Sequence, residues 1–247
     1  MDKNFFFIGH RGTRTDLDEN TLLAFNKSLV FGANYIEFDV RKTKDEQLVI
    51  LHDPTLDRTT NGKGNLRRFT YKELKNFKTI IDYTYIPLLS EVLKKLKGKI
   101  KFIIEVKDEN INNKIVGIIK DLGVFGDSIL SGRNLKDLDC IKKNYPNIVT
   151  CFNITYGSGL TLREFMNLCS ENNLNHNFDI VCLRSNLVSK EFVEVCQRNK
   201  IRSLAWNFLN YNDPINKIIA LIRLGVNGIL FDNYQNIPLI KEWFKLN

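Results

Sequence analysis

The sequence predicts an α/β fold, a closed (β/α)8 barrel with a small insertion after the second strand. Short runs rich in β-branched and aromatic residues alternate with amphipathic helical segments, and eight such pairs follow one another in order. The length of 247 residues suits a single barrel of this kind. No linker rich in proline, glycine or serine and no internal repeat interrupts the pattern, so residues 1–247 are predicted to form one domain.

The barrel strands are expected where hydrophobic runs are short and rich in strand-forming residues. They are Phe5–Gly9, Tyr35–Val40, Ile100–Glu105, Ser128–Ser131, Ile148–Phe152, Asp179–Leu183, Arg202–Trp206 and Gly228–Phe231. Each is followed by a segment with the apolar period of a helix. These helices are expected at Thr21–Phe31, Leu89–Leu96, Asn110–Leu122, Lys136–Tyr145, Thr161–Asn172, Lys190–Asn199, Pro214–Leu224 and Ile237–Phe244. Asn20 and Asp213 are the expected N-caps of two of them.

One further strand-like run, Leu48–His52, does not fit the barrel pattern. Only seven residues separate it from Val40, which is too few for a crossover between parallel strands. The polar stretch Thr43–Gln47 is therefore predicted to be the turn of a β-hairpin.

The register of this hairpin follows from where its turn is centred. A turn centred between Asp45 and Glu46 places Asp39 directly opposite His52, with their Cβ atoms within about 5.5 Å. The insertion, about residues 41–86, also contains a short helical segment at Tyr71–Phe77. It is expected to lie over the barrel mouth.

Composition limits the class of protein. A hydrophobic content of 43% and a charged content of 26% are ordinary for a globular protein, and the apolar runs fall short of the ~20 residues of a transmembrane helix. The amino terminus lacks a secretory cleavage pattern, so a cytoplasmic location is expected. The net charge of +8 favours an anionic substrate or membrane surface, and no dense basic block indicates nucleic acid.

The cysteines are expected to be reduced and largely buried, because they are odd in number, lie mostly within apolar runs and show no C-x-x-C spacing. They are Cys140, Cys151, Cys169, Cys182 and Cys196. This pattern does not predict a zinc site.

Charged side chains gather at the predicted C-terminal ends of the strands, where barrels of this kind carry their chemistry. Glu37 and Asp39 stand at i and i+2 and therefore point to one face, and Glu105 ends the next strand. Three carboxylates from adjacent strands predict an oxygen-ligand site for Mg²⁺ or Ca²⁺. His10 and His52 end runs beside them and indicate acid/base catalysis.

Two cations and one aromatic residue complete the predicted site. Arg11 and Lys107 supply positive charge, and a guanidinium can bind two oxygens of a phosphate at once. An ion pair with Glu105 on the surface is the alternative role for Lys107. Trp206 ends the seventh strand, where either substrate contact or packing inside the barrel accounts for it.

Several segments together resemble the glycerophosphodiester phosphodiesterase family. They are Ile8-Gly9-His10-Arg11-Gly12, Glu19-Asn20-Thr21, Ala24-Phe25, Gly32–Val40, His52–Gly64 and Glu105-Val106-Lys107, with weaker likeness at Pro87–Leu93, Ala205-Trp206-Asn207 and Gly225–Ile229. The likeness spans nearly the whole chain and is most specific in its first third. The family fold is a (β/α)8 barrel of the phospholipase-C-like type, which agrees with the strand count.

The resemblance implies an enzyme that hydrolyses glycerophosphodiesters to sn-glycerol 3-phosphate and an alcohol. It implies that His10 and His52 are the acid/base pair and that Arg11 and Lys107 contact the phosphate. The divalent cation, Mg²⁺, Ca²⁺ or Mn²⁺, would be held by a set of carboxylates, namely Glu37, Asp39 and Glu105. Both water and the glycerol hydroxyl of the substrate remain open as the attacking oxygen.

Two alternatives stand beside this prediction. The first is a lysophospholipase D whose insertion binds an acyl chain, with Leu66-Arg67-Arg68-Phe69 as a weak membrane-surface contact. The second is a non-catalytic barrel that binds glycerophosphodiesters. The chain departs from the family pattern at Leu17-Asp18 and at Ser131-Gly132-Arg133, and the second departure bears on the size of the alcohol pocket.

Overall fold

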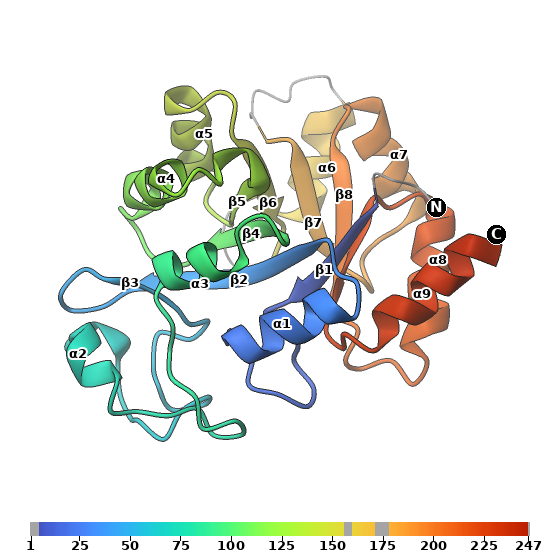
Figure 1. Ribbon diagram of the computed structural model, residues 1–247. Coiled ribbons are helices and arrows are strands. Elements are labelled where there is room, and N and C mark those ends of the chain that lie inside the picture. The colour runs from blue at the N-terminus through green and yellow to red at the C-terminus, as the bar shows by residue number, and fades with distance from the viewer. Residues whose placement is uncertain (1–4, 156–159, 171–177, 247) are drawn as a thin grey trace.

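The computed structural model describes residues 5–155, 160–170 and 178–246, and within them eight parallel strands form a closed barrel (Figure 1). The barrel strands are β1 (Phe6–His10), β2 (Tyr35–Lys42), β4 (Lys101–Val106), β5 (Ser128–Gly132), β6 (Val149–Asn153), β7 (Ile180–Arg184), β8 (Arg202–Trp206) and β9 (Gly228–Phe231). They neighbour one another in the order β1-β9-β8-β7-β6-β5-β4-β2, and pairing of β2 with β1 closes the ring. The predicted fold class is therefore confirmed.

Helices surround the ring and lie between successive strands (Figure 1). They are α1 (Leu22–Val30), α3 (Leu89–Leu96), α4 (Asn112–Asp121), α5 (Leu135–Asn144), α6 (Leu162–Ser170), α7 (Lys190–Arg198), α8 (Pro214–Leu224) and α9 (Asn236–Leu246). A short 3-10 turn, η2 (Phe125–Asp127), precedes β5. The predicted helices lie close to these bounds, and the last two residues of the predicted Thr161–Asn172 lie outside the described residues.

The predicted cap Asp213 is confirmed, whereas Asn20 is not the cap of α1. The Asp213 side chain accepts a hydrogen bond from the Asn216 N–H at 2.9 Å. At α1 the cap is Thr21, whose hydroxyl accepts from the Ala24 N–H. Asn20 has a positive φ of 62° and its side chain turns toward the barrel instead.

Two hydrophobic layers follow from the alternation of side chains along each strand. Side chains that point into the barrel form a small inner cluster, which includes Phe6, Ile8, Ile103, Ile129 and Leu204. Side chains on the outer face pack against the helices in a much larger cluster. Both layers are buried, so the strands are continuous apolar runs that end in polar residues at one end of the barrel.

The predicted hairpin is present, but its predicted register is wrong by one residue. β3 (Leu48–Ile50) runs antiparallel to β2, with Val40 opposite Ile50. The next pair along is Asp39 and Leu51, since the Leu51 N–H donates to the Asp39 carbonyl oxygen at 3.0 Å. His52 lies one position beyond the residue opposite Asp39.

The turn explains the shift. Thr43 N–H donates to the Gln47 carbonyl, which leaves a three-residue loop, and Glu46 within it has a φ of 58°. A three-residue loop with one left-handed residue is a common hairpin connection, and it moves the pairing by one position relative to an even-numbered loop. A glycine at that position would have indicated a positive φ in the sequence, whereas a glutamate does not.

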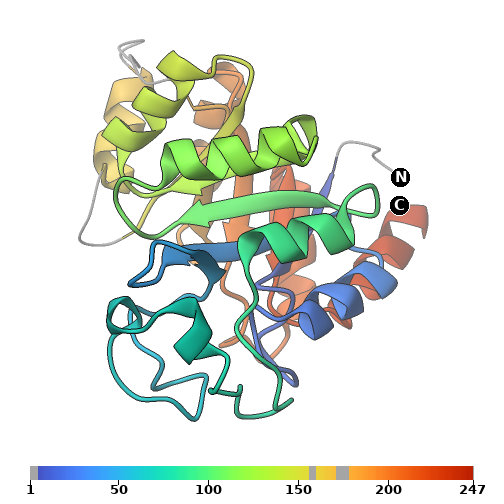
Figure 2. The same cartoon turned by 60° about the vertical axis from the view of Figure 1, so that its left-hand side comes forward.

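The insertion packs on its own small core. It contains η1 (Leu66–Arg68) and α2 (Tyr71–Leu74), the latter shorter than predicted, and it projects beyond the end of β2 (Figure 2). Leu66 is fully buried in that core and Phe69 packs against Phe77. The apolar side chains of the predicted lipid contact Leu66–Phe69 are thus used within the insertion.

Four cysteines are buried and Cys140 is exposed, and all five are free thiols. In the described part of the chain, no helix combines the length and apolar character needed to cross a bilayer.

Candidate active site

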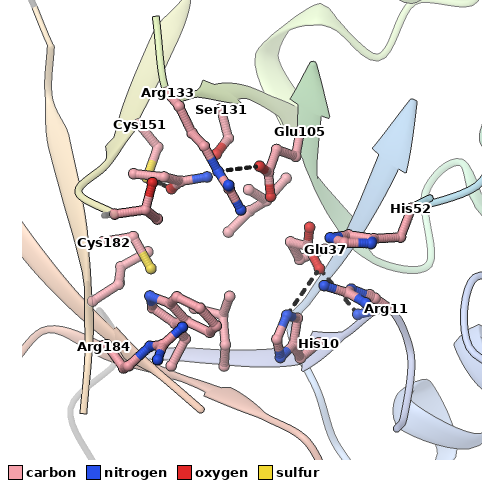
Figure 3. A pocket seen from close by; sticks show the side chains of 16 residues that line it. His10, Arg11, Glu37, His52, Glu105, Ser131, Arg133, Cys151, Cys182 and Arg184 are labelled. Carbon is pink, nitrogen blue, oxygen red and sulfur yellow. Dashed lines mark hydrogen bonds and ion pairs between the residues drawn. The ribbon is translucent and has the colours of Figure 1, made fainter. Parts of the chain in front are cut away.

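Strand alternation places one polar side chain after another at the C-terminal end of the barrel. There they line a cavity of about 240 Å³ (Figure 3). The predicted residues His10, Arg11, Glu37, His52, Glu105 and Trp206 all line it. It also receives the side chains of Ser131, Arg133, Cys151, Asn153, Thr155, Cys182 and Arg184.

Three carboxylates converge on one side of the site. One oxygen each of Glu37, Asp39 and Glu105 lies within 4.8 Å of the others, and all three residues are buried. Strand register produces this convergence, because Asp39 pairs with Glu105 across β2 and β4. Burial, with repulsion from Asp39 and Glu105, raises the pKa of Glu37 well above its usual value.

The donor set fits a hard divalent cation. Glu37 Oε1 is buried and accepts no hydrogen bond from any described residue. A buried carboxylate oxygen without a partner is costly, and a cation bound by several carboxylate oxygens is the usual remedy. The cluster therefore has the chemistry of a Mg²⁺ or Ca²⁺ site.

Asp39 stays ionised because cations surround it. Burial alone would raise its pKa, but Lys107 and Arg11 hold it well below the usual range. Lys107 Nζ is 3.1 Å from Asp39 Oδ1, and Arg11 Nε is 3.2 Å from Asp39 Oδ2. The amide of Asn20 donates to the same Oδ2 at 2.9 Å, which explains why Asn20 does not cap α1.

His10 is held by Asp232, which follows β9. His10 Nδ1 is 2.7 Å from Asp232 Oδ1, and this contact leaves Nε2 on the side of Glu37, 3.9 Å from Glu37 Oε2. Burial lowers the pKa of His10 while Asp232 opposes that change. The ring also lies edge-to-face with Trp206, with centroids 6.1 Å apart.

His52 is held in the same manner by its neighbour Asp53. The distance from His52 Nδ1 to Asp53 Oδ1 is 2.6 Å, and Arg58 Nε binds the other oxygen of Asp53 at 2.6 Å. Burial lowers the pKa of His52, and the nearby charge of Asp39 opposes it. Because β3 ends before His52, the residue reaches the cavity by leaving the ladder, with its carbonyl accepting from Arg41 Nε at 2.8 Å.

Arg11 borders the cavity and is held there by hydrogen bonds and ion pairs. Its backbone N–H donates to Glu37 Oε2 at 3.0 Å, and its Nη1 donates to Glu19 at 2.9 Å. Burial opposes its charge, but Asp39, Glu19 and Glu37 together raise its pKa. Its fixed guanidinium borders the same space as the carboxylates and both histidines (Figure 3).

Lys107 bridges the acids rather than forming a surface pair. Its Nζ is 2.5 Å from Glu105 Oε1 as well as close to Asp39, and its side chain is only 8% exposed. Burial opposes the charge, but the two carboxylates raise the pKa of Lys107.

Four residues in or beside this site were given no catalytic or binding role in the sequence-based prediction. Asp53 could have been predicted to lie at the site because it is adjacent to His52. Asp232 could have been predicted there because it follows the last strand, which must pair with the first strand in a closed barrel. Arg133 was noted only as a departure from the family pattern. Arg184 gave no signal beyond its place at the end of a strand.

The chain is similar to known proteins along most of its length. Residues 10–236 match the model of the glycerophosphoryl diester phosphodiesterase family. The chain is 32% identical over 243 residues to the glycerophosphodiester phosphodiesterase of Caldanaerobacter subterraneus, covering 93% of this chain and 95% of that protein.

Solved structures share the fold at lower identity. A glycerophosphodiester phosphodiesterase of Thermotoga maritima superposes with a TM-score of 0.78 at 24% identity, covering 98% of this chain and all of that one. A phosphodiesterase of Oleispira antarctica, in complex with the product sn-glycerol-3-phosphate, superposes with a TM-score of 0.79 at 21% identity over 96% of both chains.

Proposed function

Because this chain belongs to the glycerophosphoryl diester phosphodiesterase family, we propose that it releases sn-glycerol 3-phosphate by metal-dependent hydrolysis with two histidines. The family match supports its activity as a glycerophosphodiester phosphodiesterase. The product complex of the Oleispira antarctica relative supports the identity of the product. The other product is the alcohol.

The proposed metal ligands are Glu37, Asp39 and Glu105. The support is their convergence within 4.8 Å and the unpartnered Glu37 Oε1. When bound, a divalent cation would neutralise charge on the nonbridging phosphate oxygens as the transition state forms. Mg²⁺, Ca²⁺ and Mn²⁺ all accept such oxygen ligands.

The two histidines are proposed to divide proton transfer between them. Each has its Nδ1 engaged by a carboxylate, Asp232 for His10 and Asp53 for His52, so each has Nε2 available for the substrate. Burial lowers the pKa of both histidines, but it is deeper at His10, whose side chain is 5% exposed, than at His52, whose side chain is 27% exposed. We therefore assign His10, where the neutral form is favoured more strongly, as the base. His52 is then the acid that protonates the leaving alkoxide, and each role contributes roughly 10²–10⁴-fold.

The cations and the indole are proposed to bind substrate. Arg11 borders the cavity beside the carboxylates, where it would contact a phosphate oxygen. Lys107 is proposed to contact the phosphate as well, while it balances the charge of Asp39 and Glu105. Trp206 forms part of the wall near His10.

The observation that carries the proposal is the acidic cluster between two histidines, each positioned by its own carboxylate. A catalytically silent binding barrel does not need this arrangement. The test is turnover of glycerophosphocholine, glycerophosphoethanolamine and glycerophosphoglycerol with Mg²⁺, Mn²⁺ or Ca²⁺, read out as sn-glycerol 3-phosphate formed. Binding of these diesters without release of product from any of them would contradict the proposal.

A further inference from the structure

We propose that the wall of the cavity across from the histidines is a subsite for the alcohol of the diester, and that Arg184 and Arg133 make it select alcohols that carry an anionic group. This inference rests on the proposed function and specifies its substrate class. In Figure 3, Arg184 lies across the cavity from His52 and Glu37, and Arg133 lies on the rim beside Glu105.

Arg184 covers a face of the indole of Trp206. The two residues are register partners at the ends of β7 and β8, so their side chains leave the sheet on the same face. The guanidinium carbon of Arg184 lies 4.9 Å from the centroid of the Trp206 ring. A quaternary ammonium that would bind an exposed indole meets a positive charge here instead.

Within the part of the chain that the structure describes, the charge of Arg184 is not matched by an acid. Among the described residues, no carboxylate pairs with its guanidinium, which lies against the indole of Trp206. A guanidinium placed over a ring can still direct its N–H groups to a ligand through two parallel hydrogen bonds. A carboxylate or phosphate group is the ligand that this geometry suits best.

Arg133 adds a second cation to the same cavity. It follows the end of β5, its side chain is 43% exposed, and its Nε lies 3.5 Å from Glu105 Oε1. That oxygen is already bound more closely by Lys107 Nζ, at 2.5 Å. The positive charge of Arg133 is therefore only partly neutralised by Glu105. A divalent cation bound by Glu105 would leave still less of that carboxylate's charge to neutralise Arg133.

Among the described residues of the cavity, the wall between the two arginines presents polar side chains and no acid. It presents Ser131, Asn153 and Thr155, together with the thiols of Cys151 and Cys182. Burial raises the pKa of both thiols, so they add no negative charge. A diester with an anionic alcohol would meet positive charge on this side of the cavity.

Three matched diesters of glycerol 3-phosphate test the selectivity, with choline, ethylene glycol or glycolate as the alcohol. They present a cation, a neutral hydroxyl and a carboxylate at similar distances from the phosphorus. We expect kcat/KM with Mg²⁺ to be about tenfold higher for the glycolate diester than for the glycol diester, as for a charge-assisted pair, and lowest for choline. Equal values for the three would overturn the subsite.

Variants of Arg184 and Arg133 test whether these residues cause the preference for an anionic alcohol. Arg184→Gln should lower the glycolate-to-glycol ratio of kcat/KM at least about fivefold, and Arg184→Lys should restore only part of it. Arg133→Gln should lower the same ratio. The matched control is Arg202→Gln: Arg202 begins β8 at the opposite end of the barrel and stacks on Phe6 at 5.4 Å, so its loss should leave the ratio unchanged. An unchanged ratio in Arg184→Gln would also overturn the inference.

Binding separates this inference from the proposed function. Calorimetry on His52→Ala with Mg²⁺ should rank the affinities glycolate, then glycol, then choline. That ranking without turnover by the wild type would support the subsite and contradict the phosphodiesterase mechanism. Turnover of all three diesters without a ranking by charge would contradict the subsite and leave the mechanism intact.

Discussion

His10 and Asp232 stand 222 positions apart in the chain, yet His10 Nδ1 and Asp232 Oδ1 are 2.7 Å apart. Closure of the barrel produces this contact, since β1 pairs with β9 and each residue lies at the C-terminal end of its strand. Asp232 also binds Arg14 Nη1 at 3.0 Å and accepts from the Phe208 N–H at 2.6 Å. The carboxylate is thus fixed on three sides, and it fixes the histidine in turn.

Asp232→Asn should lower both stability and turnover. Burial works to raise the pKa of Asp232, but His10 and Arg14 lower it to about 2. Because this folded-state pKa lies below the unfolded value of ~3.9, its contribution, about 2 kcal/mol, is present above pH 4 and is lost as the pH falls toward 2. In urea unfolding at pH 7, Asp232→Asn should have a lower free energy of unfolding than the wild type, and this difference should be smaller at pH 2.5. A difference in the free energy of unfolding that does not change with pH would contradict a stabilising role of the ionised Asp232 carboxylate.

The divalent cation should stabilise the fold through Glu37. Adding Mg²⁺, Mn²⁺ or Ca²⁺ to protein treated with EDTA should raise the Tm, because the cation relieves repulsion among three buried carboxylates. Glu37→Gln should lose most of this rise, whereas Glu91→Gln, on α3 outside the cluster, should keep it. Chelation should also abolish turnover. Full activity in excess EDTA after exhaustive dialysis would rule out the metal role.

Gly9→Ala should disturb the site through packing. A Cβ on Gly9 would lie 2.7 Å from Ser28 Cβ on α1, so β1 or α1 must shift, at a cost of about 1–3 kcal/mol. His10 is the next residue, so turnover should fall as well. The control is Gly117→Ala in α4, where no atom lies within 4 Å of the added carbon and stability should rise by up to about 1 kcal/mol. Equal effects of both variants in urea unfolding would contradict the packing account.

Most of the barrel could be predicted because its strands and helices carry strong local patterns. Runs such as Phe6–His10 and Gly228–Phe231 are apolar on both faces, as parallel strands between two hydrophobic layers must be. Strand alternation then assigned Glu37 and Asp39 to one face. The structure agrees, because both carboxylates join the buried cluster with Glu105.

Features decided by backbone conformation or by contacts distant in sequence were missed. The hairpin register depended on Glu46 adopting a positive φ, which glutamate does not signal. Asn20 resembles a helix cap in sequence, but its side-chain amide donates to Asp39 on the adjacent strand β2. The pairing of Arg184 with Trp206 required the relative register of β7 and β8, which the sequence does not specify.

The separate roles of the histidines can be examined by changing the leaving group. His52→Ala should lose about 10²-fold or more in kcat with glycerophosphocholine, since no acid protonates the alkoxide. With a p-nitrophenyl diester of glycerol phosphate the loss should be far smaller, because p-nitrophenolate departs unprotonated. His10→Ala should lose at least about 10²-fold with both substrates, because a base is still needed.

The most direct test of the central claim is therefore one ratio: the loss of kcat in His52→Ala with glycerophosphocholine divided by its loss with the p-nitrophenyl diester. Thermal unfolding of each variant serves as the control for folding. If His52 is the acid and His10 the base, we expect a ratio of about ten or more for His52→Ala and a ratio near one for His10→Ala. A ratio near one for both variants would contradict the division of acid and base between His52 and His10, and the reverse pattern would exchange their roles.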